Sequence, residues 1–208
     1  MATTITRMLP FRQYDDMNVI NMFSLDAITG EAGSLVKISA ADLNLDPVSL
    51  ITRSDSLSFQ NYMGNASSLY PTVPYKVTKV ATTGEAPIGI LLKDVRSVDE
   101  NGENLQYYPR KKEELQCVIS GEAVPIATRG LFMMNSRAFL GGVCPAINSW
   151  AIPAANGTFT GLAFSHANQT GSPLRPYAVG KFVATGSRYP QADADEFSGV
   201  YAILKLEL

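Results

Sequence analysis

The sequence contains few of the residues from which active sites are usually built. It has one histidine, one tryptophan and two cysteines among 208 residues. A Ser-His-Asp or Cys-His arrangement would depend on His166 alone, which lies in a polar segment typical of a surface loop. Cys117 and Cys144 form no CxxC motif and no Cys/His cluster, so we expect buried free thiols.

Charge is also scarce and nearly balanced. Seventeen basic and 19 acidic residues give a net charge of -2, and charged residues make up 17% of the chain. The one mixed aromatic and basic stretch is Tyr107 to Lys112, and Glu113 and Glu114 offset much of its charge. We therefore expect neither nucleic acid nor an anionic membrane as a partner.

No apolar run approaches the roughly 20 residues that span a bilayer. Residues 1–10 lack the charged start and the apolar block of a secretory signal peptide. We therefore expect a soluble protein that is made in a cytoplasm.

Acidic clusters and glycine-rich loops do not match known binding motifs. Asp193, Asp195 and Glu196 lie in a Pro/Ala/Asp loop without the spacing of a calcium-binding loop. The segment from Gly30 to Lys37 lacks the Gly-Lys-Ser/Thr ending of a phosphate loop. The sequence predicts no metal, no cofactor and no catalytic residue.

What the chain does contain is a series of short β-branched and aromatic runs between Gly, Pro and Asn turns. This pattern is typical of an all-β fold, either a compact β-barrel or a sandwich. Asn101-Gly102 is a strong hairpin signal, because both residues tolerate positive φ. The runs cover residues 77–81, 88–92, 115–119, 123–127, 177–184 and 200–206.

The first part of the chain has a different pattern. We expect an N-terminal arm, a hairpin and a linker over residues 1–74, and a β-barrel body over residues 75–208. The hairpin would join a run around residues 19–25 to residues 35–38 through the turn at 29–33. Apolar side chains occur on both faces of the first run, which suits strand addition to a neighbouring subunit. The candidate partner-binding residues are Tyr14, Val19, Ile20, Met22, Phe23 and Leu25.

Four segments in the second half follow an order that resembles the decoration, or cement, proteins of tailed-bacteriophage heads. In those proteins a Gly-Glu-x-Val strand precedes a Gly-x-Phe strand, further glycine-initiated strands and a terminal Val/Leu-Lys-Leu strand. The resemblance covers about residues 77–208. The matching segments are Gly121–Phe132, Ala138–Val143, Val179–Ser187 and Gly199–Leu206.

This resemblance implies a structural protein without catalytic activity. Such a protein binds the outer surface of a capsid, clamps neighbouring major capsid subunits and forms a homo-oligomer, a trimer in such families. Its location would be the virion, after synthesis in the bacterial host cytoplasm. Three alternatives stay open: a collar, tail or head-fibre protein, a β-scaffold hydrolase that uses His166, and a carbohydrate-binding module in which Trp150 or exposed tyrosines stack on sugars.

Overall fold

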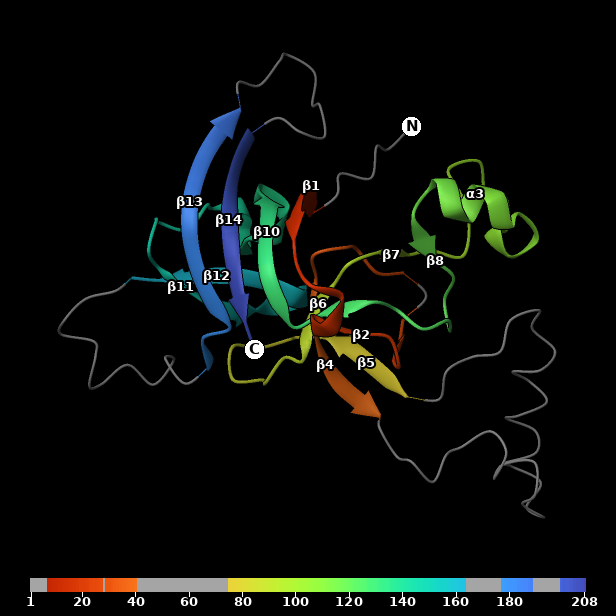
Figure 1. The fold of residues 1–208 in the computed structure, drawn as a ribbon, viewed down its shortest axis with the longest axis horizontal. Helices are drawn as coiled ribbons and strands as arrows, with labels where there is room; N and C mark the ends of the chain where they lie inside the picture. Colours follow the sequence, from red (N-terminus) through yellow and green to blue (C-terminus); the bar gives the residue numbers. More distant parts are fainter. Residues whose placement is uncertain (1–6, 28, 41–74, 164–176, 189–198) are drawn as a thin grey trace.

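The structure is a computed structural model that describes residues 7–27, 29–40, 75–163, 177–188 and 199–208 (Figure 1). Two six-stranded sheets dominate these residues. Every strand pair in the first sheet, sheet A, is antiparallel. In spatial order its strands are β1 (Met8–Gln13), β10 (Arg129–Asn135), β14 (Gly199–Glu207), β13 (Gly180–Arg188), β11 (Trp150–Ala154) and β12 (Thr158–Leu162).

The second sheet, sheet B, is built from shorter strands. All its pairs are antiparallel except the parallel pair of β3 and β5. In spatial order its strands are β2 (Val19–Ile20), β9 (Ile126–Ala127), β6 (Gly89–Leu91), β4 (Leu35–Ala40), β5 (Lys76–Lys79) and β3 (Ser24–Leu25).

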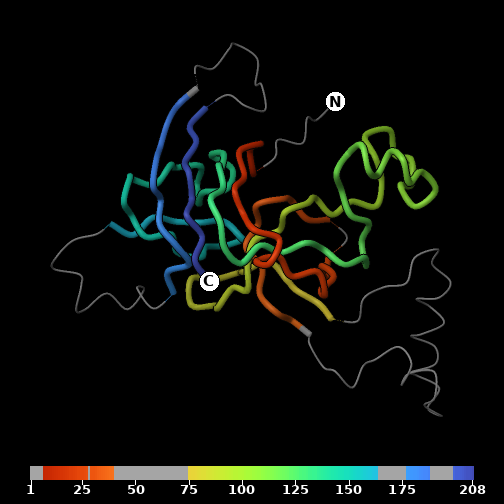
Figure 2. The backbone as a smooth tube through the Cα atoms, in the orientation of Figure 1, coloured from red at the N-terminus to blue at the C-terminus, as the bar shows by residue number. Residues whose placement is uncertain are grey.

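The two sheets share one antiparallel ribbon at their corner. β1 pairs with β10 in sheet A, and the same two chain segments continue as β2 and β9 in sheet B. Figure 2 shows these red and green segments running together between the sheets. The 3-10 turn η1 (Asp16–Asn18) and Thr128 mark the bend, where Thr128 donates from its backbone N to the Asn18 carbonyl at 2.9 Å.

The main core lies between the sheets. It combines Phe132, Phe182 and Leu204 of sheet A with Leu35 and Ile90 of sheet B. Successive side chains of the sheet B strands point to opposite faces: Val36 and Leu91, which follow Leu35 and Ile90, belong to a second cluster on the other face. Strands that are buried on both faces read as continuous apolar runs.

A small module protrudes from the side opposite β13 (Figure 1). It contains the parallel pair β7 (Asp94–Val95) and β8 (Cys117–Val118), the 3-10 turn η3 (Leu105–Tyr107) and the helix α3 (Pro109–Glu114). Leu105, Cys117 and Ile119 form its own apolar cluster. The remaining 3-10 turns are η4 (Ser136–Ala138), η5 (Leu140–Gly142) and η6 (Ala155–Gly157).

The all-β prediction is confirmed, in its sandwich form. β1 and β12 are the two ends of sheet A in the described residues, so the sheet does not close into a barrel. The predicted turn at Asn101-Gly102 is also confirmed: Gly102 has φ 82°, and the Asp99 backbone N donates to the Glu103 carbonyl at 2.9 Å.

The expected N-terminal arm differs from the structure. Residues 7–40 are not separate from the rest of the fold, because they supply strands to both sheets. The expected hairpin is wrong as well: β3 pairs with β5 and with the Ala123 backbone, while β4 pairs with β5 and β6. The expected linker over residues 42–74 lies outside the described residues.

Candidate partner interface

One long segment of the chain contains no Asp, Glu, Lys or Arg, from Ala138 to Leu174. Residues 138–163 of this segment are described and form the loop after η4, the hairpin of β11 and β12, and η6 between them. Charged residues are depleted at the centres of protein interfaces relative to the rest of a protein surface. We call the loop Phe139–Ser149 together with β12 the charge-free face.

The loop of the charge-free face exposes three large aliphatic side chains. Leu140 is 51% exposed, Val143 is 72% exposed and Ile147 is 61% exposed. Single exposed apolar residues are ordinary on a protein surface, but these three concentrate exposed apolar surface within one short uncharged loop, as interaction sites do.

The backbone holds this loop in a defined conformation. Gly141, Gly142 and Asn148 have φ of 65°, 71° and 63°, in the left-handed region that glycine and asparagine adopt most readily. Ser149 donates from its hydroxyl to the Ala146 carbonyl at 2.6 Å, and the Asn148 backbone N donates to the Phe182 carbonyl at 2.7 Å. A loop that is ordered before binding loses less conformational entropy when a partner covers it.

The loop also packs against the edge strand β12. A Cβ atom at Gly161 would lie 2.7 Å from the Cβ atom of Pro145, so the glycine lets the loop approach the strand closely. Phe139 forms a β-bridge with Phe159. β12 carries no charged residue, although charged side chains are a common means of protecting a sheet edge from further strand pairing.

The predicted partner-binding residues are divided by the fold. Phe23 and Leu25 are only 4% and 3% exposed and belong to the second apolar cluster, so their use as exposed contacts is wrong for this structure. The physical reason is that the segment with these two residues pairs with β5 and with the Ala123 backbone, which are distant in the chain, and this pairing covers their side chains. Val19 and Ile20 are half-buried in β2, and each packs against one of the two cores.

Two of the predicted residues stay accessible. Met22 is 45% exposed, and Tyr14 is 39% exposed at the corner between the sheets. The structure does not bring these two together with the charge-free face, because Tyr14 follows β1 and Met22 lies between β2 and β3 of sheet B. The signal that finds the charge-free face in the sequence is the missing charge from Ala138 to Leu174.

The chemistry-bearing residues have structural partners where they are described. His166 lies outside the described residues, as do Asp193, Asp195 and Glu196. The described part of the chain holds no group of three or more His, Cys, Asp or Glu side chains suited to a metal. Trp150 is half-buried, and the Lys181 ammonium lies 4.2 Å from the centroid of its ring.

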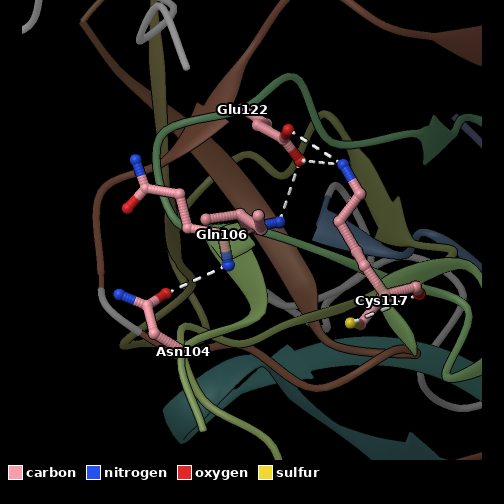
Figure 3. Close-up of polar contacts among 6 residues, drawn as sticks. Asn104, Gln106, Cys117 and Glu122 are labelled. Carbon is pink, nitrogen blue, oxygen red and sulfur yellow. Dashed lines mark hydrogen bonds and ion pairs between the residues drawn. The ribbon is translucent and has the colours of Figure 1, made fainter. Parts of the chain in front are cut away.

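Both cysteines are free thiols, as predicted; Cys117 is also buried as expected, whereas Cys144 is only half-buried. Burial raises the pKa of both thiols, which lowers the fraction of reactive thiolate. Around Cys117 the polar groups serve the module's own structure: Glu122 accepts from the Lys112 ammonium at 3.0 Å and from the Ile119 backbone N (Figure 3). Asn104 caps η3 by accepting from the Gln106 backbone N at 3.0 Å.

The aromatic and basic stretch of the module is exposed, with Tyr107 at 66% and Tyr108 at 48%. Its lysines are paired with carboxylates: Lys111 with Asp99 and Glu103, and Lys112 with Glu122. This pairing leaves little excess positive charge for a phosphate backbone.

No helix in the described ranges has the length and apolar character needed to cross a membrane. No protein-family model, no curated protein and no solved structure matches this chain.

Proposed function

We propose that the chain is a virion structural protein that binds the outer surface of a phage capsid and clamps neighbouring major capsid subunits. The charge-free face is the observation that carries the proposed binding role, since it joins an ordered apolar loop to an uncharged sheet edge. The assignment to a phage capsid rests on the resemblance of residues 121–132, 138–143, 179–187 and 199–206 to decoration proteins.

The fold changes the mechanism expected for attachment. The N-terminal strands are integral to both sheets, so attachment through a free arm is replaced by docking of a preformed surface. Leu140, Val143 and Ile147 would each contribute about 1–2 kcal/mol when their remaining surface is covered. The gross gain of about 3–6 kcal/mol per copy is modest alone, but a homo-oligomer that engages several capsid subunits at once multiplies it.

The proposal needs no chemistry. It assigns no catalytic residue, cofactor or metal to the chain, and its partners are the major capsid protein and further copies of itself, as a trimer if the resemblance holds. Nucleic acid and membranes are not among the proposed partners. The protein would be made in the bacterial host cytoplasm and reside on the capsid surface.

The first experiment is quantitative mass spectrometry of purified particles. A copy number near that of the major capsid protein supports lattice decoration. A ratio of a few per cent would instead place the same face in the collar, tail or a head fibre. Absence from particles would refute a virion role and favour the hydrolase and binding-module alternatives.

The second experiment tests the face itself. Val143→Lys and Ile147→Lys place a charge where the apolar contact is proposed, and we expect both variants to attach poorly to particles that lack the protein. Val98→Lys is the matched control, because Val98 is 47% exposed but lies in the protruding module. Equal attachment of all three variants would show that the charge-free face is not the docking surface.

A further inference from the structure

A groove of about 450 Å³ lies at the corner where the two sheets join, within the size range of small-ligand sites. Its lining comes from three distant parts of the chain: the end of β1 with η1, the start of β10 and the end of β14. The charge-free face lies toward the other end of β10 and β14, since its loop follows β10 and η4 and its Cys144 thiol donates to the Tyr201 carbonyl near the start of β14 at 3.7 Å.

An aromatic ring lies on one side of the groove. Tyr14 stacks on Phe132, with ring centroids 5.9 Å apart and an angle of 22° between the ring planes. Phe132 is completely buried, whereas Tyr14 stays 39% exposed. The stack therefore fixes the Tyr14 ring from below and leaves part of its surface open to a ligand.

Gly130 permits this arrangement. Its φ is 147°, and a Cβ atom there would lie 2.7 Å from the Gln13 carbonyl oxygen and 2.9 Å from the Tyr14 Cβ atom. Any larger residue would push Tyr14 away from its position over Phe132. The groove is thus shaped by a backbone feature as well as by its side chains.

Polar side chains of several kinds line the same groove. Gln13 and Asn18 carry amides, Arg129 carries a guanidinium, and Asp15 carries a carboxylate of which one oxygen accepts from the Met17 backbone N at 3.2 Å. These planar groups offer paired donors or paired acceptors. Arg129 is exposed, and the Asn18 backbone is held by two hydrogen bonds from Thr128, at 2.9 Å from its N and 3.0 Å from its Oγ1.

The charges of the groove cancel. The negative charges of Asp15 and Glu207 balance the positive charges of Arg129 and Lys205, and Lys205 forms an ion pair with Glu207 at 2.6 Å. A phosphorylated or strongly acidic ligand would require an excess of positive charge, which the lining does not have. An apolar ligand would desolvate the amides and the guanidinium without offering them a hydrogen-bond partner.

We propose that this groove binds a neutral saccharide, with one sugar ring lying on Tyr14 and its hydroxyls bonded to the surrounding planar groups. A sugar ring presents C–H groups on its face and hydroxyls around its rim, and the groove is lined by an exposed aromatic residue and by residues with amide, carboxylate and guanidinium groups. This inference does not depend on the proposed capsid role, because the groove and the charge-free face share no residue.

The test uses the full chain and saturation-transfer NMR with glucose, galactose, mannose, N-acetylglucosamine, maltose, lactose and chitobiose as probes. We expect saturable binding of at least one of them. Tyr14→Ala should weaken that binding by about tenfold or more, whereas Tyr14→Phe, which keeps the ring, should stay within about twofold. Tyr177→Ala is the matched control, because Tyr177 is 38% exposed and does not line the groove.

A second variant guards against a folding defect at the corner. Arg129→Ala changes an exposed side chain outside the core and should weaken the same sugar by about fivefold with an unchanged melting temperature. Absence of saturable binding by every probe would overturn the proposal. Unchanged affinity in both Tyr14→Ala and Arg129→Ala, or binding of sialic acid or a sugar phosphate in place of the neutral probes, would also overturn it.

Discussion

The sharpest test of the fold uses two adjacent residues with opposite surroundings. Phe23 is 4% exposed within the second apolar cluster, whereas Met22 is 45% exposed. If residues 19–25 formed a free arm, truncating either side chain would leave the stability of the protein unchanged. The structure instead predicts that Phe23→Ala is strongly destabilising and Met22→Ala is nearly neutral.

The expected magnitude follows from burial. Replacing a core phenylalanine by alanine costs about 3–5 kcal/mol, because transfer free energy is lost and a cavity remains. The strand itself stays in place, since the Phe23 carbonyl still accepts from the Val124 backbone N at 2.8 Å. An exposed side chain such as Met22 should change the free energy of unfolding by no more than about 0.5 kcal/mol.

Urea unfolding followed by circular dichroism measures both effects. With a slope of about 1–3 kcal/mol per molar urea, the midpoint for Phe23→Ala should fall by at least about 1 M. Phe23→Leu, which keeps most of the volume, should lose about 1 kcal/mol and provides a measurable variant if the alanine variant does not fold. Equal midpoints for Phe23→Ala, Met22→Ala and the wild type would refute the placement of residues 19–25 in the sheets.

Two further predictions concern a close approach and an ion pair. Gly89→Ala should lose about 1–3 kcal/mol of unfolding free energy in urea, because its Cβ atom would meet the Ala127 carbonyl and lie 2.5 Å from an Ile126 methyl group. Gly84→Ala is the control and should stay within about 0.5 kcal/mol, because a Cβ atom there would have nothing within 4 Å. Similar losses in the two variants would contradict the packing of β6 on β9. Hydrogen bonds from Lys111 and from the Glu103 and Asn101 backbones lower the pKa of Asp99 below its ordinary 3.8. The stability that these bonds contribute is therefore present above pH 3.8 and is lost as the pH falls through the pKa of the folded state. Thermal melts between about pH 2 and pH 6 should therefore show a smaller acid-induced drop for Asp99→Asn than for the wild type, and parallel curves would contradict the lowered pKa.

The strands of the sandwich were predictable because their signal is local. The run at residues 88–92 is apolar at successive positions, and the structure places Ile90 and Leu91 in the cores on opposite faces of sheet B. Residues 200–206 alternate, and only Ala202, Leu204 and Leu206 are buried. Patterns of this kind depend on burial of a residue's own side chain, which its type largely determines.

The pairing of the short strands could not be predicted in the same way. β2 and β3 are two residues long, and their partners are far away in the chain, as in the pairs Val19 with Ala127 and Ser24 with Lys76. A local pattern shows that residues 19–25 need cover on both faces, but it does not show whether this cover comes from the same chain or from another. The prediction of an arm therefore identified the correct apolar residues but assigned their cover to a neighbouring subunit, whereas it comes from the same chain.

The two candidate sites differ in the same respect. The charge-free face lies in one continuous segment, so the run without charge from Ala138 to Leu174 would identify it from sequence. The groove takes its lining from three segments around Tyr14, Arg129 and Glu207, which only the folded corner brings together. No spacing rule along the chain connects these positions.

The groove and the charge-free face share no residue and involve opposite ends of β10 and β14, which leads to a last prediction. Distant sites without shared residues act independently, so their variants should have separable effects. Val143→Lys should attach poorly to particles and bind the sugar that the wild type binds with unchanged affinity. Tyr14→Ala should attach normally and lose the sugar. The double variant, measured by co-sedimentation with particles and by saturation-transfer NMR, should combine both losses without any change in their size. Loss of sugar binding in Val143→Lys would show that the two sites are coupled along the strands that join them, which the close packing of Phe132, Phe182 and Leu204 in the main core argues against.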